Sequence, residues 1–66
     1  MTEFQLMLGI FTRRYGEDRV GADFSPNRGG YIEIEDQFLT FVFDKYGTLE
    51  WIHNEQAARL YGPLGD

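Results

Sequence analysis

His53 is the residue best suited to chemistry, because two carboxylates stand close to it in the sequence. It is the only histidine, and Glu50 and Glu55 are its acidic neighbours. The order His53-Asn54-Glu55 also occurs in zinc deaminases, but their site needs a Pro-Cys-x-x-Cys segment, and this chain has no cysteine. A catalytic zinc normally takes three protein ligands. A small metal-binding or hydrolytic protein centred on His53 is therefore an alternative hypothesis, and the sequence assigns no metal ligand and no cofactor.

Glu33 and Glu35 form a second candidate pair, about 7 Å apart on one face of a strand. Paired carboxylates catalyse acid–base reactions inside a cleft. Here they alternate with Ile32 and Ile34, and such alternation predicts a face turned to water. Ser25 is the only serine and precedes a proline, so no serine nucleophile with a neighbouring base is indicated. We therefore expect no catalytic residue and no enzyme.

The segment Ser25–Gly30, SPNRGG, is the only one that resembles an anion-binding loop. Backbone amides together with Arg28 could hold a phosphate. The lysine and the glycine spacing of a Walker A loop are absent. A turn that precedes a strand is the more frequent use of such a segment.

The first segment, Met1–Gly16, has the start and stop signals of a helix. Thr2 and Gln5 fit a capping box, and Gly16 suits the position that follows a helix. Apolar side chains recur at helical spacing between these signals, at Phe4, Met7, Leu8, Phe11 and Tyr15. The alternation of Phe4, Leu6, Leu8 and Ile10 would also fit a strand. We favour the helix because both of its ends are marked.

Three later segments have the pattern of strands: Tyr31–Glu35, Phe38–Phe43 and Thr48–Ile52. Asp36-Gln37 and Asp44–Gly47 provide the connections. In the third strand, Leu49 and Trp51 are expected on one face. Val20–Phe24 could add a short edge strand. Asn54 is a good N-cap for a short C-terminal helix, which Gly62-Pro63 would end.

The predicted fold is a small α+β domain that spans residues 1–66. It has an N-terminal helix, a three-stranded antiparallel meander and a short C-terminal helix. If the first segment were a strand, the alternative would be a five-stranded small β-barrel with a C-terminal helix.

Composition limits the function further. With 66 residues and no cysteine, the core is small and no disulfide can reinforce it, so a homodimer or a larger partner would add burial. The net charge of −5 opposes direct nucleic-acid binding and favours basic partners. The apolar runs are too short for a membrane span, and the N-terminus lacks the pattern of a signal peptide. These features predict a cytoplasmic protein without membrane contact.

Aromatic residues exceed what so small a core needs, and acidic residues stand among them. Tyrosine and tryptophan dominate the binding energy of many protein interfaces, and acidic neighbours attract a basic surface. The leading hypothesis is therefore a non-enzymatic protein-interaction module. One form of it is a small acidic inhibitor from a phage or mobile element that occludes a basic, nucleic-acid-binding surface of a host enzyme. A single-stranded nucleic-acid binder is a further alternative. The predicted binding residues are Tyr31, Glu33, Glu35, Asp36, Phe38, Asp44, Tyr46, Glu50 and Trp51.

Overall fold

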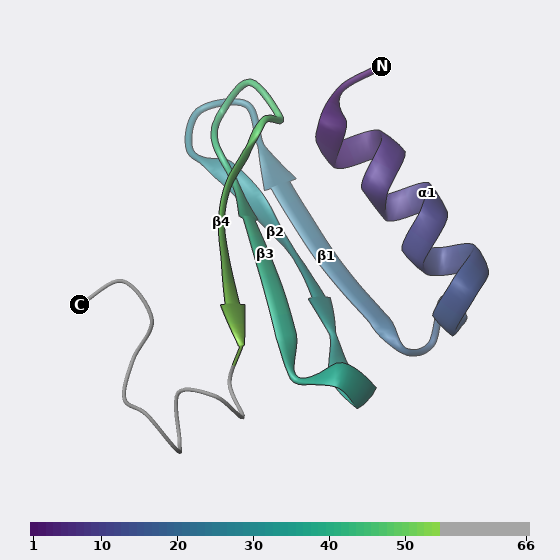
Figure 1. Ribbon diagram of the computed structural model, residues 1–66. Helices are drawn as coiled ribbons and strands as arrows, with labels where there is room; N and C mark the ends of the chain where they lie inside the picture. The colour runs from purple at the N-terminus through teal and green to yellow at the C-terminus, as the bar shows by residue number, and fades with distance from the viewer. Residues whose placement is uncertain (55–66) are drawn as a thin grey trace.

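One helix packs on one face of an antiparallel sheet in the computed structural model, which describes residues 1–54 (Figure 1). The elements in chain order are α1 (Glu3–Tyr15), β1 (Val20–Ser25), β2 (Gly29–Ile34), the 3-10 turn η1 (Glu35–Gln37), β3 (Leu39–Phe43) and β4 (Leu49–Asn54). The predicted α+β class and the N-terminal helix are confirmed. The expected C-terminal helix falls outside the described residues, and Asn54, its expected N-cap, is the last residue of β4.

The capping box decides the conformation of the first segment. Thr2 Oγ1 accepts a hydrogen bond from the amide of Gln5 at 3.2 Å, and Gln5 Oε1 accepts one from the amide of Thr2 at 2.9 Å. The amide of Phe4 donates to the carbonyl of Gly47 at 2.9 Å, so three amides of the helix start have partners. Gly16 ends the helix with φ +93°. Residues that alternate like a strand therefore form a helix here.

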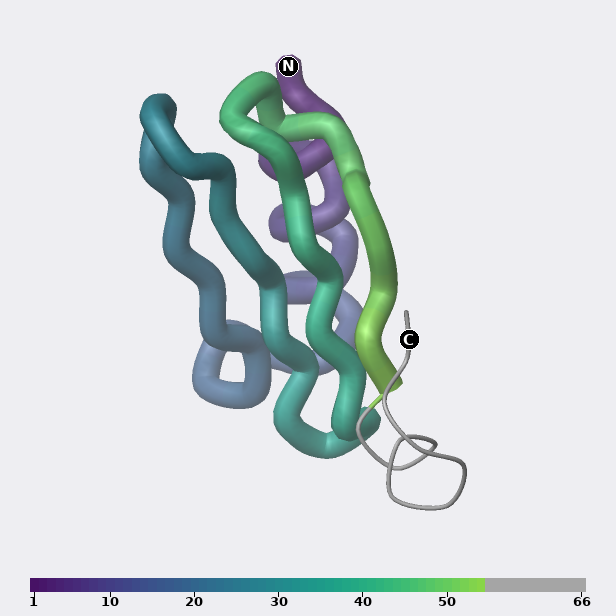
Figure 2. Tube along the Cα trace, turned by 90° about the vertical axis from the view of Figure 1, so that its left-hand side faces the viewer, coloured from purple at the N-terminus to yellow at the C-terminus, as the bar shows by residue number. Residues whose placement is uncertain are grey.

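The sheet has four strands in the order β1-β2-β3-β4, each antiparallel to its neighbour (Figure 2). The predicted three-stranded meander is not matched exactly, because Val20–Ser25 pairs with β2 along its whole length and adds a fourth strand. The suggested edge strand at Val20–Phe24 is thereby confirmed. In the described part of the chain the four strands form an open sheet, and the first segment of the chain is a helix. The barrel alternative is therefore wrong.

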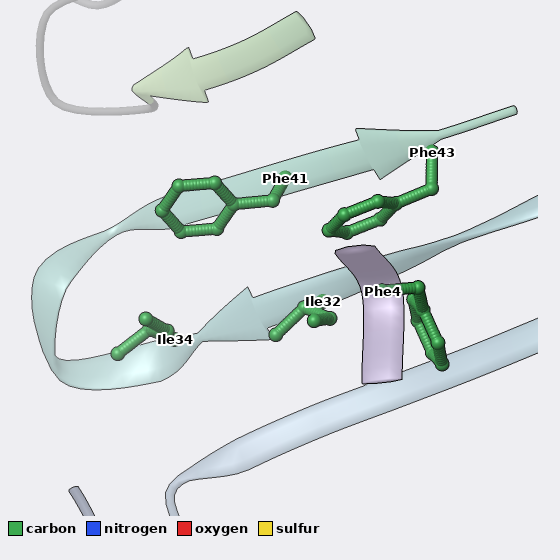
Figure 3. Close-up of a cluster of buried hydrophobic side chains, with 5 residues drawn as sticks. All are labelled: Phe4, Ile32, Ile34, Phe41 and Phe43. Carbon is green, nitrogen blue, oxygen red and sulfur yellow. The ribbon is translucent and has the colours of Figure 1, made fainter. Parts of the chain in front are cut away.

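The core lies between α1 and the sheet (Figure 3). Its buried members all come from β2, β3 and the first turn of α1: Phe4, Ile32, Ile34, Phe41 and Phe43. The Phe4 ring meets Phe43 edge-on at 5.1 Å and Phe24 at 5.0 Å. Burying each of these side chains contributes about 1.5–3 kcal/mol. The alternating isoleucines of β2 and phenylalanines of β3 thus face the helix, as their spacing predicts.

Two details of the strands differ from expectation. Phe38 has φ 55° and ends η1 in the left-handed region, so β3 begins only at Leu39. The register between β3 and β4 shifts between Val42 and Phe43. Leu49 consequently pairs with Phe43 on the helix side, whereas Trp51 pairs with Val42 on the other side. The expectation that Leu49 and Trp51 share a face was wrong, because a β-bulge reverses the alternation.

Candidate functional site

The sheet face that points away from α1 carries no other element of the described residues (Figure 2). We call it the outer face. Because side chains alternate along a strand, the strand register assigns to it Gly21, Asp23, Tyr31, Glu33, Thr40, Val42, Trp51 and His53. One row crosses all four strands, since Asp23 pairs with Tyr31, Tyr31 with Val42, and Val42 with Trp51.

This row presents two large aromatic rings to solvent. The exposed fractions are 41% for Tyr31 and 47% for Trp51, with half-buried Val42 between them. Trp51 also meets the His53 ring edge-on, with ring centres 5.8 Å apart. Strand pairing fixes the backbone that carries both rings, so binding of a partner would not have to order that backbone. An apolar strip of this kind is typical of an interface.

Two carboxylates flank Tyr31 on the outer face. Asp23 lies opposite it on β1, and Glu33 follows it by two positions on β2. Within residues 1–54, the ion pairs involve only Arg19, with Asp18 and with Asp36. The charges of Asp23 and Glu33 are therefore not neutralised by an ion pair in that part of the chain, and they give the aromatic row an acidic border.

The predicted binding residues lie in four different places. Tyr31, Glu33 and Trp51 share the outer face. Glu35, Asp36 and Phe38 lie at the β2–β3 connection, and Asp44 and Tyr46 lie in the β3–β4 turn. These two connections are at opposite ends of the sheet (Figure 1). Glu50 lies in the irregular stretch of β4 and has no paired residue on β3.

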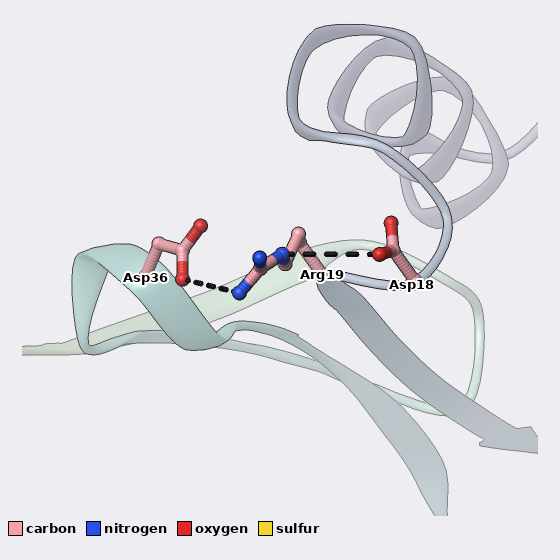
Figure 4. A network of polar contacts seen from close by, with 3 residues as sticks. All are labelled: Asp18, Arg19 and Asp36. Atoms are coloured by element: carbon pink, nitrogen blue, oxygen red, sulfur yellow. Dashed lines mark hydrogen bonds and ion pairs between the residues drawn. The ribbon is translucent and has the colours of Figure 1, made fainter.

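Asp36 has an internal partner. Arg19 Nη1 lies 3.2 Å from Asp36 Oδ1, and Arg19 Nε lies 3.9 Å from Asp18 Oδ2 (Figure 4). This pair links the start of β1 to η1. Asp36 is therefore less available to an external cation than Asp23 or Glu33.

Tyr46 is the most exposed of the predicted aromatic residues, at 73%. Its ring has the ammonium of Lys45 5.3 Å from its centre. The turn itself is built by Asp44, whose Oδ1 accepts from the amides of Tyr46 at 2.9 Å and Thr48 at 3.0 Å. The Asp44 carboxylate thus has a structural role in the turn, as expected of a capping aspartate.

Several outer-face residues were missed because their placement depends on strand pairing. Asp23 becomes a neighbour of Tyr31 only through the β1–β2 register, and Val42 joins the rings only through the two other registers. The sequence signal that could have placed Asp23 on the outer face is the weak alternation of Val20, Ala22 and Phe24. These three residues pair with the inward residues of β2.

A hollow of about 310 Å³ opens at the β1–β2 hairpin, next to the aromatic row. Its lining is Asp23, Ser25, Asn27, Arg28, Gly29, Gly30 and Tyr31. The loop amides that an anion would need are engaged inside the turn: Asn27 donates to Ser25 Oγ at 3.3 Å, and Arg28 donates to the Ser25 carbonyl at 3.2 Å. The segment that resembles an anion-binding loop therefore closes a hairpin.

The paired glycines have a structural reason. A Cβ on Gly30 would lie 2.2 Å from the Asp23 carbonyl oxygen and 2.9 Å from the Phe24 ring. Gly29 has φ +95°, and a Cβ there would lie 2.2 Å from the Phe43 carbonyl oxygen. Close packing against neighbouring backbone thus restricts both positions to glycine.

His53 lies on the outer face, but its predicted neighbour Glu55 is outside the described residues. Within residues 1–54 no group of three or more histidine and acidic side chains is placed to hold a metal ion.

In the same part of the chain no helix is long and apolar enough to cross a membrane. No protein-family model, curated protein or solved structure matches the chain.

Proposed function

We propose that this chain is a non-enzymatic protein-interaction module that binds a basic surface of another protein through its outer face. The observation that carries the proposal is the row Tyr31–Val42–Trp51, which is half exposed on a sheet face that no other element of residues 1–54 covers. Beside it lie two carboxylates that form no ion pair within those residues. A face used only for solubility would not need two large rings in register across three strands.

The two kinds of side chain contribute differently to binding. Trp51 and Tyr31 would supply most of the affinity, because aromatic anchors in a desolvated interface cost about 2 kcal/mol or more when truncated. Asp23 and Glu33 would mainly orient the partner and speed association, an effect that salt screens. The net charge of −5 adds to this attraction.

A narrower form of the proposal is an acidic inhibitor, from a phage or mobile element, that covers a nucleic-acid-binding surface. Small size and acidity support it. Duplex DNA presents one charge per roughly 1.7 Å, which is denser than the charge on this face. The aromatic row would therefore be the principal contact, and the acids its border.

Affinity capture from a bacterial lysate tests the proposal with matched aromatic variants. Trp51→Ala removes a ring from the outer face, and Tyr46→Ala removes a more exposed ring from a turn outside it. We expect one partner to be captured by the wild type and by Tyr46→Ala, to be lost with Trp51→Ala, and to decrease at high salt. Equal capture by both variants, or no salt effect, would count against the outer face as a docking surface for basic proteins.

Single-stranded nucleic acid is a second candidate, favoured by one observation. Exposed rings on an open sheet face are what stacked bases require, and Tyr31 and Trp51 provide them. Asp23 and Glu33 on the same face would repel phosphates. We expect no quenching of Trp51 fluorescence by an oligothymidylate at low salt, and saturable quenching would favour this candidate over a protein partner.

A further inference from the structure

We propose that the hollow at the β1–β2 hairpin receives an arginine side chain of the partner protein, which pairs with Asp23 and stacks on Tyr31. This rests on the proposed function and deepens it, because the hollow adjoins the aromatic row and shares Asp23 and Tyr31 with the outer face. The partner would contribute an arginine, and its side chain would enter at the β1–β2 hairpin.

The Asp23 carboxylate has one oxygen available to bind a cation. Its Oδ1 accepts a hydrogen bond from the amide of Phe24 at 2.9 Å, which fixes the carboxylate. Oδ2 has no hydrogen bond or ion pair with any other residue among 1–54. Tyr31 is the cross-strand partner of Asp23, so its ring and the carboxylate border the same space. A guanidinium can bond to a carboxylate and stack on a ring at once, which an ammonium does less well.

The size of the hollow suits one side chain. Its volume of about 310 Å³ is at the lower end of ligand pockets, which span about 300–1,000 Å³. Gly29 and Gly30 belong to its lining, and a Cβ on either would lie within 3 Å of neighbouring backbone atoms, so neither position accepts a larger residue. The hollow therefore lies between the tightly packed backbone of the hairpin and the side chains of Asp23 and Tyr31.

The chemistry of the lining favours a cation over an anion. The amides of Asn27 and Arg28 donate inside the turn, so they offer nothing to a phosphate. Among residues 1–54, Arg28 is the only basic residue that lines the hollow. It is exposed and has no ion pair within the described residues, so its long side chain can extend into solvent when a second cation enters. Arg28 would then weaken cation binding, and its removal would strengthen it.

The test uses the full chain and the probe N-acetyl-L-arginine amide, followed by amide chemical shifts in ¹H–¹⁵N NMR. We expect saturable shifts at Gly29, Gly30 and Tyr31, and none with the uncharged citrulline analogue. Asp23→Asn should weaken the probe about ten-fold, as expected for loss of a charge-assisted pair. Glu17→Gln, which removes an exposed acid in the loop before β1, should change the affinity little, and Arg28→Gln should tighten binding.

Three results would overturn the assignment. They are the absence of saturable shifts at the three amides up to the solubility limit of the probe, equal binding of the citrulline analogue, and binding of inorganic phosphate that Arg28→Gln abolishes. None of them bears on capture of a partner through Trp51. The pocket and the proposed function can therefore fail separately.

Discussion

Replacing Gly30 by alanine should destabilise the protein far more than the same change at Gly21. Both glycines lie in the β1–β2 pair. A Cβ on Gly30 would lie 2.2 Å from the Asp23 carbonyl oxygen and 2.8 Å from the Phe24 Cα, whereas a Cβ on Gly21 would meet nothing within 4 Å. The obstructing atoms at Gly30 belong mainly to the backbone, so rotamer changes cannot relieve the overlap, and the cost should be at the upper end of overpacking, about 3 kcal/mol.

At Gly21 the change should be neutral or stabilise by up to about 1 kcal/mol, because alanine restricts the unfolded chain more than glycine. The total free energy of unfolding for 66 residues is on the order of 3–10 kcal/mol. A loss of 3 kcal/mol would lower the melting temperature by about 12–24 °C in a domain of this size.

Urea and thermal unfolding followed by far-UV circular dichroism would measure both variants against the wild type. Equal stability of Gly30→Ala and Gly21→Ala would refute the reasoning. It would mean that Phe24 and Asp23 do not pack against Gly30, and the β1–β2 register that brings Asp23 beside Tyr31 would then be wrong.

Three further expectations concern the scaffold, each checked by urea unfolding. Thr2→Ala removes the side-chain acceptor of the capping box and should cost about 1 kcal/mol, and an unchanged midpoint would argue against the cap. Phe43→Ala leaves a cavity at a side chain that is 1% exposed and should cost about 3–5 kcal/mol, enough to unfold much of the population. A cooperative unfolding transition with a midpoint close to that of the wild type would contradict the placement of Phe43 in the core. Asp44→Ala leaves the amides of Tyr46 and Thr48 without their acceptor and should cost about 1–3 kcal/mol, with faster amide exchange at both residues, and unchanged exchange would exclude that turn.

The helix and the core strands could be predicted because their signals are local. The Thr2–Gln5 box and Gly16 mark both ends of α1, and they outweigh the alternation that would suit a strand. The isoleucines of β2 and phenylalanines of β3 alternate strictly, and the inward members are buried. Local signals of this kind need no knowledge of the rest of the fold.

The fourth strand and the bulge depend on tertiary pairing. Val20–Ser25 contains Gly21 and Asp23, which are unfavourable in strands, and it becomes a strand because β2 offers it a full set of partners. The bulge opposite Phe43 places Leu49 and Trp51 on opposite faces, and nothing in the residues Leu49–Trp51 signals it. The candidate site was incomplete for the same reason, since Asp23 and Val42 reach Tyr31 only across strands.

The dissociation constant of the captured partner for wild type, Trp51→Ala and Tyr46→Ala tests the central claim most directly. At low salt we expect Trp51→Ala to weaken binding about 30-fold, the equivalent of about 2 kcal/mol for an interface anchor, while Tyr46→Ala stays within about two-fold of wild type. A weaker affinity for Tyr46→Ala than for Trp51→Ala, or wild-type affinity for both, would contradict binding through the outer face.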